Sequence, residues 1–133
     1  MKRSQFQFAN PELTKVEFEI NEDFEPNSDI TSNLVTKTDI KRSEKTPEAY
    51  VTLSIISSKE NNLPFVFDIT MGVEVSWGKE CEETFINTIL KNNVPALLLS
   101  YIRPIISILT SNTGYPAFNI PFLDFRNADK ESK

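Results

Sequence analysis

The sequence predicts an α+β domain: a four-stranded antiparallel sheet with a short helix and one long, kinked helix packed on one face. Three observations support this prediction. Apolar and polar residues alternate over several stretches, most regularly over 65–77, as in strands with one buried face. Short turns separate these stretches, which favours antiparallel pairing. Residues 94–110 are instead apolar around most of a helical circumference.

The first strand is expected near the N-terminus, in two parts. Residues 5–9 and 15–20 both alternate, with apolar side chains at Phe6, Phe8, Val16, Phe18 and Ile20. Asn10-Pro11 interrupts the pattern, and a bulge or kink is expected there because proline donates no backbone hydrogen bond. A weaker pattern over 30–45 is interpreted as the second strand. Its cations suit an exposed edge: Lys37, Lys41, Arg42 and Lys45.

The third and fourth strands have clearer patterns. Residues 49–57 place Val51, Leu53 and Ile55 on one face, and a polar turn follows at 59–62. The fourth strand, 65–77, is apolar at every odd position. Since it exceeds the usual strand length, a bend or bulge is expected at Gly72.

Two helices are expected after the sheet. Residues 79–90 form a short amphipathic pattern, which Asn92-Asn93 should end. Pro95 should then begin the long helix, Pro104 should kink it, and 111–114 should stop it. Cys81 is the single cysteine, so no internal disulfide can form, and its expected role is apolar packing.

The long helix carries more apolar surface than one sheet can cover. Its polar or small residues form one narrow stripe: Ala96, Ser100, Arg103, Ser107 and Thr110. A helix of this kind needs two apolar partners. We expect the chain's own sheet and a second copy of the subunit, with an oligomer interface at Leu98, Leu99, Ile102, Ile105, Ile106 and Leu109. Arg103 and Pro104 in mid-run disfavour the alternative, a membrane span, so no membrane insertion is expected.

Composition argues against several classes of function. The chain has no histidine and only three glycines, and it contains no phosphate-binding loop motif. Asp68 and Glu74 share a strand face but should lie about 20 Å apart, too far for a paired carboxylate mechanism. We therefore expect no enzyme, no metal and no cofactor. The net charge of −5 argues against nucleic acid as a partner, and the absence of an apolar signal segment suggests a cytoplasmic protein.

Six acidic residues and no basic residue lie between Glu17 and Asp29. Two interpretations stay open for this run. It is a solvated strand face and loop, or it is a docking patch for a basic partner. The candidate docking residues are Glu17, Glu19, Glu22 and Asp23.

Two motifs resemble those of a known family. The segment Tyr115-Pro116-Ala117-Phe118-Asn119-Ile120 is similar to the aromatic-Pro-x-apolar-Asn-apolar segment of the SecB protein-export chaperones, and Asp124-Phe125 continues it. Upstream, Tyr101-x-Arg103 matches the Tyr-x-Arg of the family's long helix. The chain departs from the family at Ser100 and Pro104. It ends eight residues after Phe125, where family members usually continue into a second helix that contributes to contact with the SecA motor.

The resemblance implies a single SecB-like domain over 1–126 with a Greek-key-like sheet, followed by a polar C-terminal tail over 127–133, and a homotetramer built as a dimer of dimers. It also implies an ATP-independent holdase that binds unfolded polypeptides in apolar grooves and keeps them competent for export, with a SecA-type motor as a further partner. The client-binding candidates are Phe6, Phe8, Phe18, Trp77, Phe85, Ile89, Tyr115, Phe118 and Phe122. Two alternatives remain: a chaperone for a dedicated client such as a toxin–antitoxin pair, and a non-catalytic structural or assembly protein.

Overall fold

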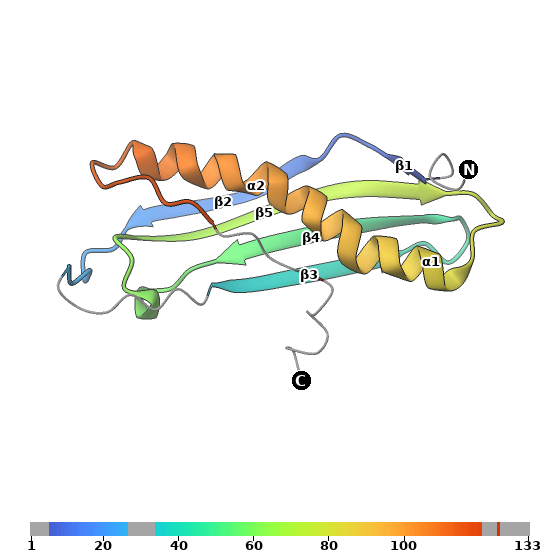
Figure 1. The fold of residues 1–133 in the computed structure, drawn as a ribbon, viewed down its shortest axis with the longest axis horizontal. Coiled ribbons are helices and arrows are strands. Elements are labelled where there is room, and N and C mark those ends of the chain that lie inside the picture. The colour runs from blue at the N-terminus through green and yellow to red at the C-terminus, as the bar shows by residue number, and fades with distance from the viewer. Residues whose placement is uncertain (1–5, 27–33, 121–124, 126–133) are drawn as a thin grey trace.

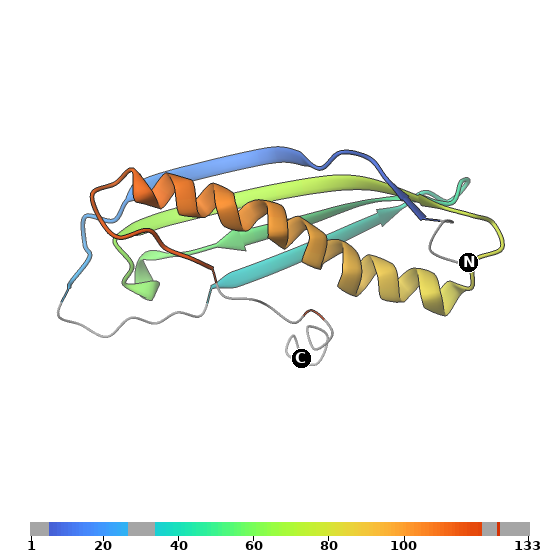
Figure 2. The ribbon, with the colours of Figure 1, turned by 45° about the horizontal axis from the view of Figure 1, so that its top comes forward.

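The computed structural model describes residues 6–26, 34–120 and Phe125. It is an α+β fold in two layers, in which one helical rod lies diagonally across one face of an antiparallel sheet (Figures 1 and 2). The predicted fold class is therefore confirmed. The expected tail, 127–133, lies outside the described residues. The strands are β1 (Phe6–Phe8), β2 (Glu12–Ile20), β3 (Val35–Arg42), β4 (Glu48–Ile56) and β5 (Phe65–Trp77).

The predicted first strand is present as two pieces on one edge of the sheet. Both β1 and β2 pair with β5: β1 lies opposite residues 75–77, and β2 lies opposite residues 65–72. The interruption falls at Asn10-Pro11, as predicted. Strands β3, β4 and β5 follow as consecutive hairpins, so the order across the sheet is β2–β5–β4–β3. This is the Greek-key-like order.

The bulge expected at Gly72 lies elsewhere. Strand β5 runs unbroken from Phe65 to Trp77, and its pairing with β4 passes through Gly72 without a shift. The extra residue is Thr14 of β2, because Leu13 and Lys15 pair with the adjacent residues Met71 and Thr70. The expectation at Gly72 was wrong because a bulge places the extra residue on one strand alone, and here that strand is the neighbour.

The two predicted helices are one continuous helix, Glu83–Ser111. Helix α1 (Glu83–Thr88) passes through the π-helical segment η3 (Ile89–Asn93) into α2 (Val94–Ser111). The expected start at residue 79 and the expected break at Asn92-Asn93 were both wrong. The amide of Val94 donates to the carbonyl of Ile89, five residues back, and this wider turn continues the helix up to Pro95.

The core lies between the helix and the sheet. Leu98, Leu99, Ile102 and Ile106 of α2 face the sheet and are at most 2% exposed. Their partners are the alternate, odd-numbered residues of the two central strands: Val51, Leu53, Ile55, Phe65, Phe67, Ile69, Met71, Val73 and Val75. Burial of this one face fixes the register of β4 against β5, because a slip by one residue would turn the apolar set to solvent.

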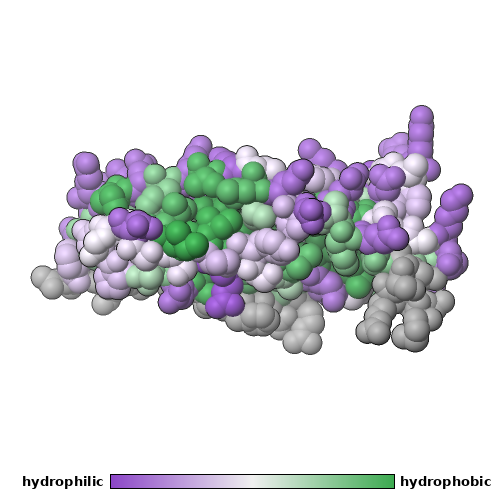
Figure 3. All heavy atoms as spheres, turned by 90° about the horizontal axis from the view of Figure 1, so that it is seen from above, coloured by the Kyte–Doolittle hydropathy of each residue, from purple (hydrophilic) through white to green (hydrophobic). Residues whose placement is uncertain are grey.

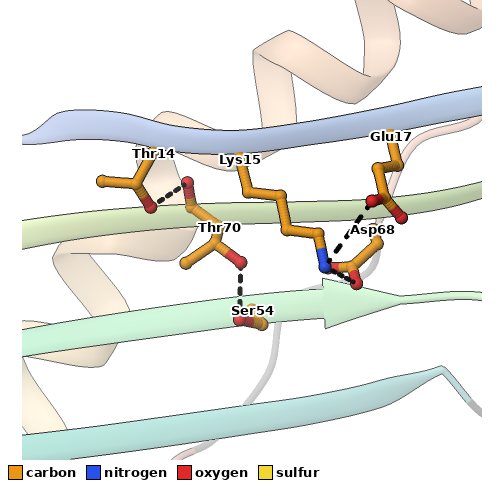
Figure 4. Close-up of polar contacts among 6 residues, drawn as sticks. All are labelled: Thr14, Lys15, Glu17, Ser54, Asp68 and Thr70. Atoms are coloured by element: carbon orange, nitrogen blue, oxygen red, sulfur yellow. Dashed lines mark hydrogen bonds and ion pairs between the residues drawn. The ribbon is translucent and has the colours of Figure 1, made fainter.

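The opposite face of the sheet is polar (Figure 4). The hydroxyls of Ser54 and Thr70 lie 2.7 Å apart across β4 and β5, and Thr14 donates to the carbonyl of Thr70 at 3.3 Å. Lys15 reaches from β2 to Asp68 on β5 at 2.9 Å. This hydrogen bond raises the pKa of Lys15 above its ordinary value.

The helix Glu83–Ser111 is long and apolar enough to cross a membrane by length and composition. One such helix is weak evidence for a membrane span, because core helices of soluble proteins pass the same test. Its sheet-facing side is already buried in the chain's own core. The absence of membrane insertion stays a prediction.

Candidate functional site

Three aromatic side chains meet at the end of the sheet where the helix begins. Phe6 of β1 lies 5.9 Å from Trp77 of β5 and 5.5 Å from Phe85 of α1, between ring centroids. Phe6 and Trp77 are 9% and 8% exposed, whereas Phe85 is 37% exposed and forms the outer surface. We call these three residues the Trp77 cluster. Three predicted client-binding residues therefore come together, with Phe6 in contact with the other two, although Phe6 and Trp77 are nearly closed to solvent.

An ion pair borders the Trp77 cluster. Arg42, the last residue of β3, donates through Nη1 to the carboxylate of Glu83, the first residue of α1. The guanidinium carbon of Arg42 also lies 5.2 Å from the centroid of the Trp77 ring, a cation–π contact. The hydrogen bond from Arg42 lowers the pKa of Glu83 below its ordinary value.

A second aromatic group lies at the other end of β5. Phe118 follows α2 and lies 5.9 Å from Phe65 and 6.3 Å from Phe67, and Phe65 stacks on Phe18 of β2 at 5.9 Å. We call these four residues the Phe118 cluster. Residues 65 and 77 of one extended strand are roughly 40 Å apart. The structure therefore divides the predicted client-binding residues between two distant ends.

The remaining predicted client-binding residues lie around these ends. Tyr115 is partly exposed and packs edge-on against Phe24, with ring centroids 5.7 Å apart. Ile89 of η3 is half-buried against the core. Phe122 lies outside the described residues.

An exposed apolar strip connects the two clusters along the edge of the sheet. Phe8, Leu13, Val16 and Ile20 lie opposite buried residues of β5, so they point to the helix-covered face. The helix crosses diagonally and leaves them 43–48% exposed. We call these four residues the edge strip. Seen from the β1–β2 side, apolar side chains gather over α2 and β2 (Figure 3).

Sequence reasoning missed three of the four residues of the edge strip as site candidates. Their alternation with polar residues in β2 marks one apolar face but does not say whether that face is covered. The available signal was their position on an edge strand, because a single helix is too narrow to cover every strand of a sheet.

The predicted oligomer interface is largely inside the subunit. Four of its six residues, Leu98, Leu99, Ile102 and Ile106, form the core, and Ile105 and Leu109 are half-buried. The outward side of α2 carries a different apolar set. Tyr101 and Ile108 are 44% and 63% exposed, and Leu97 and Pro104 lie on the same side at helical spacing.

The acidic candidates lie on and beside β2. Glu17 and Glu19 point to the polar face of the sheet, whereas Glu22 and Asp23 follow the strand in an exposed turn. A hollow of about 590 Å³ has Glu17, Glu19 and Asp68 in its lining. Two cations reduce the local negative charge: Lys15 lies 3.9 Å from Glu17, and Lys59 lies 3.2 Å from Asp23.

Within the described residues, no three side chains of His, Cys, Asp or Glu come together as a metal site. Besides Lys15 and Glu83, Tyr50 has a shifted pKa, which burial and the neighbouring Glu12 raise. Tyr50 donates to Glu12 at 3.3 Å on the polar face of the sheet. Each of the three groups with a shifted pKa has a hydrogen-bond partner on another element.

The family model of the preprotein translocase subunit SecB matches residues 5–131, which is most of the chain. An uncharacterised protein of Methanocaldococcus jannaschii is 28% identical over 118 residues, covering 86% of this chain and 76% of that protein.

Two solved structures share the fold. A SecB-like chaperone of Mycobacterium tuberculosis, solved with a ChAD peptide from the HigA1 antitoxin, matches with a TM-score of 0.71 and 14% identity over 92% of this chain and 90% of that one. A Streptococcus agalactiae protein of unknown function matches with a TM-score of 0.59 and 13% identity over 89% of this chain and 98% of that one. At such identities the likeness concerns the fold alone.

Proposed function

The chain belongs to the SecB family, and on that premise we propose that it is an ATP-independent holdase that binds unfolded or non-native polypeptides. The family match and the likeness to a SecB-like chaperone support a chaperone role. The observation that carries the proposal is the edge strip, a row of exposed apolar side chains that joins two aromatic clusters. Such a surface offers apolar contacts without a fixed shape.

The length of the edge strip suits an extended client. Burying one large apolar side chain contributes roughly 1.5–3 kcal/mol, whereas ordering and association cost on the order of 4–15 kcal/mol. Several client side chains must therefore bind at once along Phe8–Ile20. Within the described residues, β2 pairs with β5 alone, so its outer edge can also accept sequence-independent backbone hydrogen bonds.

The double variant Leu13→Thr/Val16→Thr tests this surface. Both side chains are nearly half exposed, so stability should change little, whereas binding should weaken about tenfold as apolar contact is lost. The measurement is affinity for reduced, carboxymethylated α-lactalbumin, which stays unfolded without denaturant. Val35→Thr is the matched control, since Val35 is 50% exposed on β3, away from the strip. A folded double variant with unchanged affinity contradicts the proposal.

We further propose that the subunits form a homotetramer, a dimer of dimers, with α2 between the dimers. The outward apolar residues Leu97, Tyr101, Pro104 and Ile108 support this proposal, because a second copy would remove them from water. Several strips on one particle would raise the apparent affinity for a long unfolded chain through effective concentration.

Two kinds of client are candidates for this holdase. An export chaperone in the cytoplasm would bind many precursors and keep them translocation-competent. The relative from M. tuberculosis was solved with an antitoxin peptide, which favours as a second candidate a dedicated client such as a toxin–antitoxin pair. Tight binding of carboxymethylated α-lactalbumin supports the general holdase, and absence of binding contradicts it. A structural or assembly protein would bind neither kind of chain.

Docking of a SecA-type motor on Glu17, Glu19, Glu22 and Asp23 stays a prediction. Its affinity should fall steeply with salt because exposed charges are screened. A salt-independent complex would argue against this patch.

A further inference from the structure

Phe85 of α1 packs on Phe6, a nearly buried side chain that a client is expected to contact. The ring centroids of Phe85 and Phe6 lie 5.5 Å apart, Phe6 in turn contacts Trp77, and Phe6 and Trp77 are each less than a tenth exposed. We propose that α1 is a lid over Phe6 and Trp77 and that the Arg42–Glu83 ion pair is its latch. The proposal rests on the proposed function, since it concerns access to the same client-binding surface.

The latch joins the lid to the rigid sheet. Arg42 ends β3 and pairs with Ala49 of β4, so its backbone is fixed in the sheet. Its side chain contacts the lid at Glu83, and its guanidinium carbon lies 5.2 Å from the centroid of the Trp77 ring. Both charged side chains are substantially exposed, at 35% and 64%. An exposed ion pair is weak, so it can hold a lid without locking it.

The lid has the local structure of a segment that can move. Helix α1 is the free N-terminal end of the continuous helix and has no side-chain cap at its start, and uncapped helix ends are the part of a helix that frays. The π-helical segment η3 follows it, and such segments interrupt the regular hydrogen-bond ladder of a helix. Beyond η3, Val94 and Leu98 are fully buried and fix α2 to the sheet. Motion about η3 would thus displace α1 and leave α2 in place.

Opening the lid would let a client side chain take the place of Phe85. It would withdraw Phe85 and one buried side chain of α1, Ile86, from the sheet. An aromatic side chain of a client could then replace Phe85 against Phe6 and Trp77. Phe8 and Phe6 lie on the same face of β1, so the exposed rings of Phe6 and Trp77 would extend the edge strip.

Glu83→Gln tests the latch, because it removes the charge with little change of shape. Glu82→Gln is the matched control: it removes the same charge one residue earlier, where the described residues show no ion pair. Amides of 86–88, the first with helical acceptors, should exchange about two- to fivefold faster with deuterium in Glu83→Gln, with global stability nearly unchanged. Trp77 is the single tryptophan, so acrylamide quenching of its fluorescence should rise in parallel.

The link to clients is tested with carboxymethylated α-lactalbumin. Glu83→Gln should bind it about two- to fivefold more tightly than the wild type, because the open state is more populated. The charge-exchanged variant Arg42→Glu/Glu83→Arg should return amide exchange and affinity toward the wild-type values, as it restores the pair in reverse.

Two outcomes overturn the lid. Unchanged exchange at 86–88 in Glu83→Gln would mean that the ion pair does not restrain α1, and faster exchange with unchanged affinity would mean that α1 does not control access. If the proposed function is wrong, neither the wild type nor any variant will bind the unfolded protein. That result differs from both outcomes above, in which the wild type binds.

Discussion

Gly72 and Tyr50 show how one residue shapes the polar face of the sheet. Tyr50 of β4 pairs with Glu74 of β5, but its ring reaches over Gly72, and a Cβ atom added at Gly72 would lie 2.6 Å from Cζ of that ring. The ring is held there by its hydroxyl, which donates to Glu12 of β2. Glycine at position 72 therefore leaves room for this placement of the ring, and no positive φ is involved.

Gly72→Ala should destabilise the fold by about 1–3 kcal/mol, because the added methyl group overlaps the Tyr50 ring. Urea unfolding gives the value. The same substitution in a Tyr50→Thr background should cost little, since the ring is absent and alanine suits a strand better than glycine does. If the cost is equal in the two backgrounds, the close approach of Tyr50 is not its cause.

At the scale of elements, the segment after α2 is held by its hydrogen bonds to that helix. Residues 115–120 form no helix or strand. The amide of Phe118 donates to the hydroxyl of Thr110 at 2.8 Å, and Nε of Arg103 donates to the carbonyl of Ile120 at 3.0 Å. These two contacts fold the segment back along α2 and place Phe118 against Phe65 and Phe67.

Thr110→Val should cost about 1–3 kcal/mol, because it keeps the shape of a fully buried side chain but leaves the Phe118 amide without its acceptor. Thermal or urea unfolding measures the loss, and exchange of the Phe118 amide should accelerate. Thr88→Val is the control, because the Thr88 side chain is exposed and its hydroxyl donates to the carbonyl of Thr84 in the same helix. If Thr110→Val lowers the free energy of unfolding no more than Thr88→Val does, the hydrogen bond from Phe118 to Thr110 does not hold the segment in place.

The elements themselves were predicted unequally well. The alternation over 65–77 predicted β5 with its bounds, and Asn10-Pro11 marked the true interruption of the edge strand. The end of the short helix was mispredicted at Asn92-Asn93, because these residues weaken a helix locally while the hydrophobic core on both sides keeps it continuous.

At the scale of the whole molecule, the outward side of α2 decides the oligomeric state that we propose. Ile108→Glu places a charge at a side chain that is 63% exposed, so the subunit should fold normally while the contact between copies is lost. Native mass spectrometry should give a tetramer for the wild type and a smaller species for the variant. Val35→Glu, on exposed β3, should leave the mass unchanged. A wild type that is monomeric at micromolar concentration would refute the tetramer.

The sequence by itself determined which residues share a face. The period of two predicted the sheet and its buried side, and the nearly all-round apolar character of 94–110 predicted a helix with more apolar surface than one partner covers. Both features are local, because they depend only on the repeat of the backbone.

Only the tertiary structure decided which apolar residues stay accessible. The diagonal path of the helix buries Leu98, Leu99 and Ile102 but leaves Leu13 and Val16 open, and it brings Phe85 of α1 against Phe6. Periodicity fixes the direction of a side chain relative to its own element, whereas its exposure depends on where a second element from a distant part of the chain comes to lie.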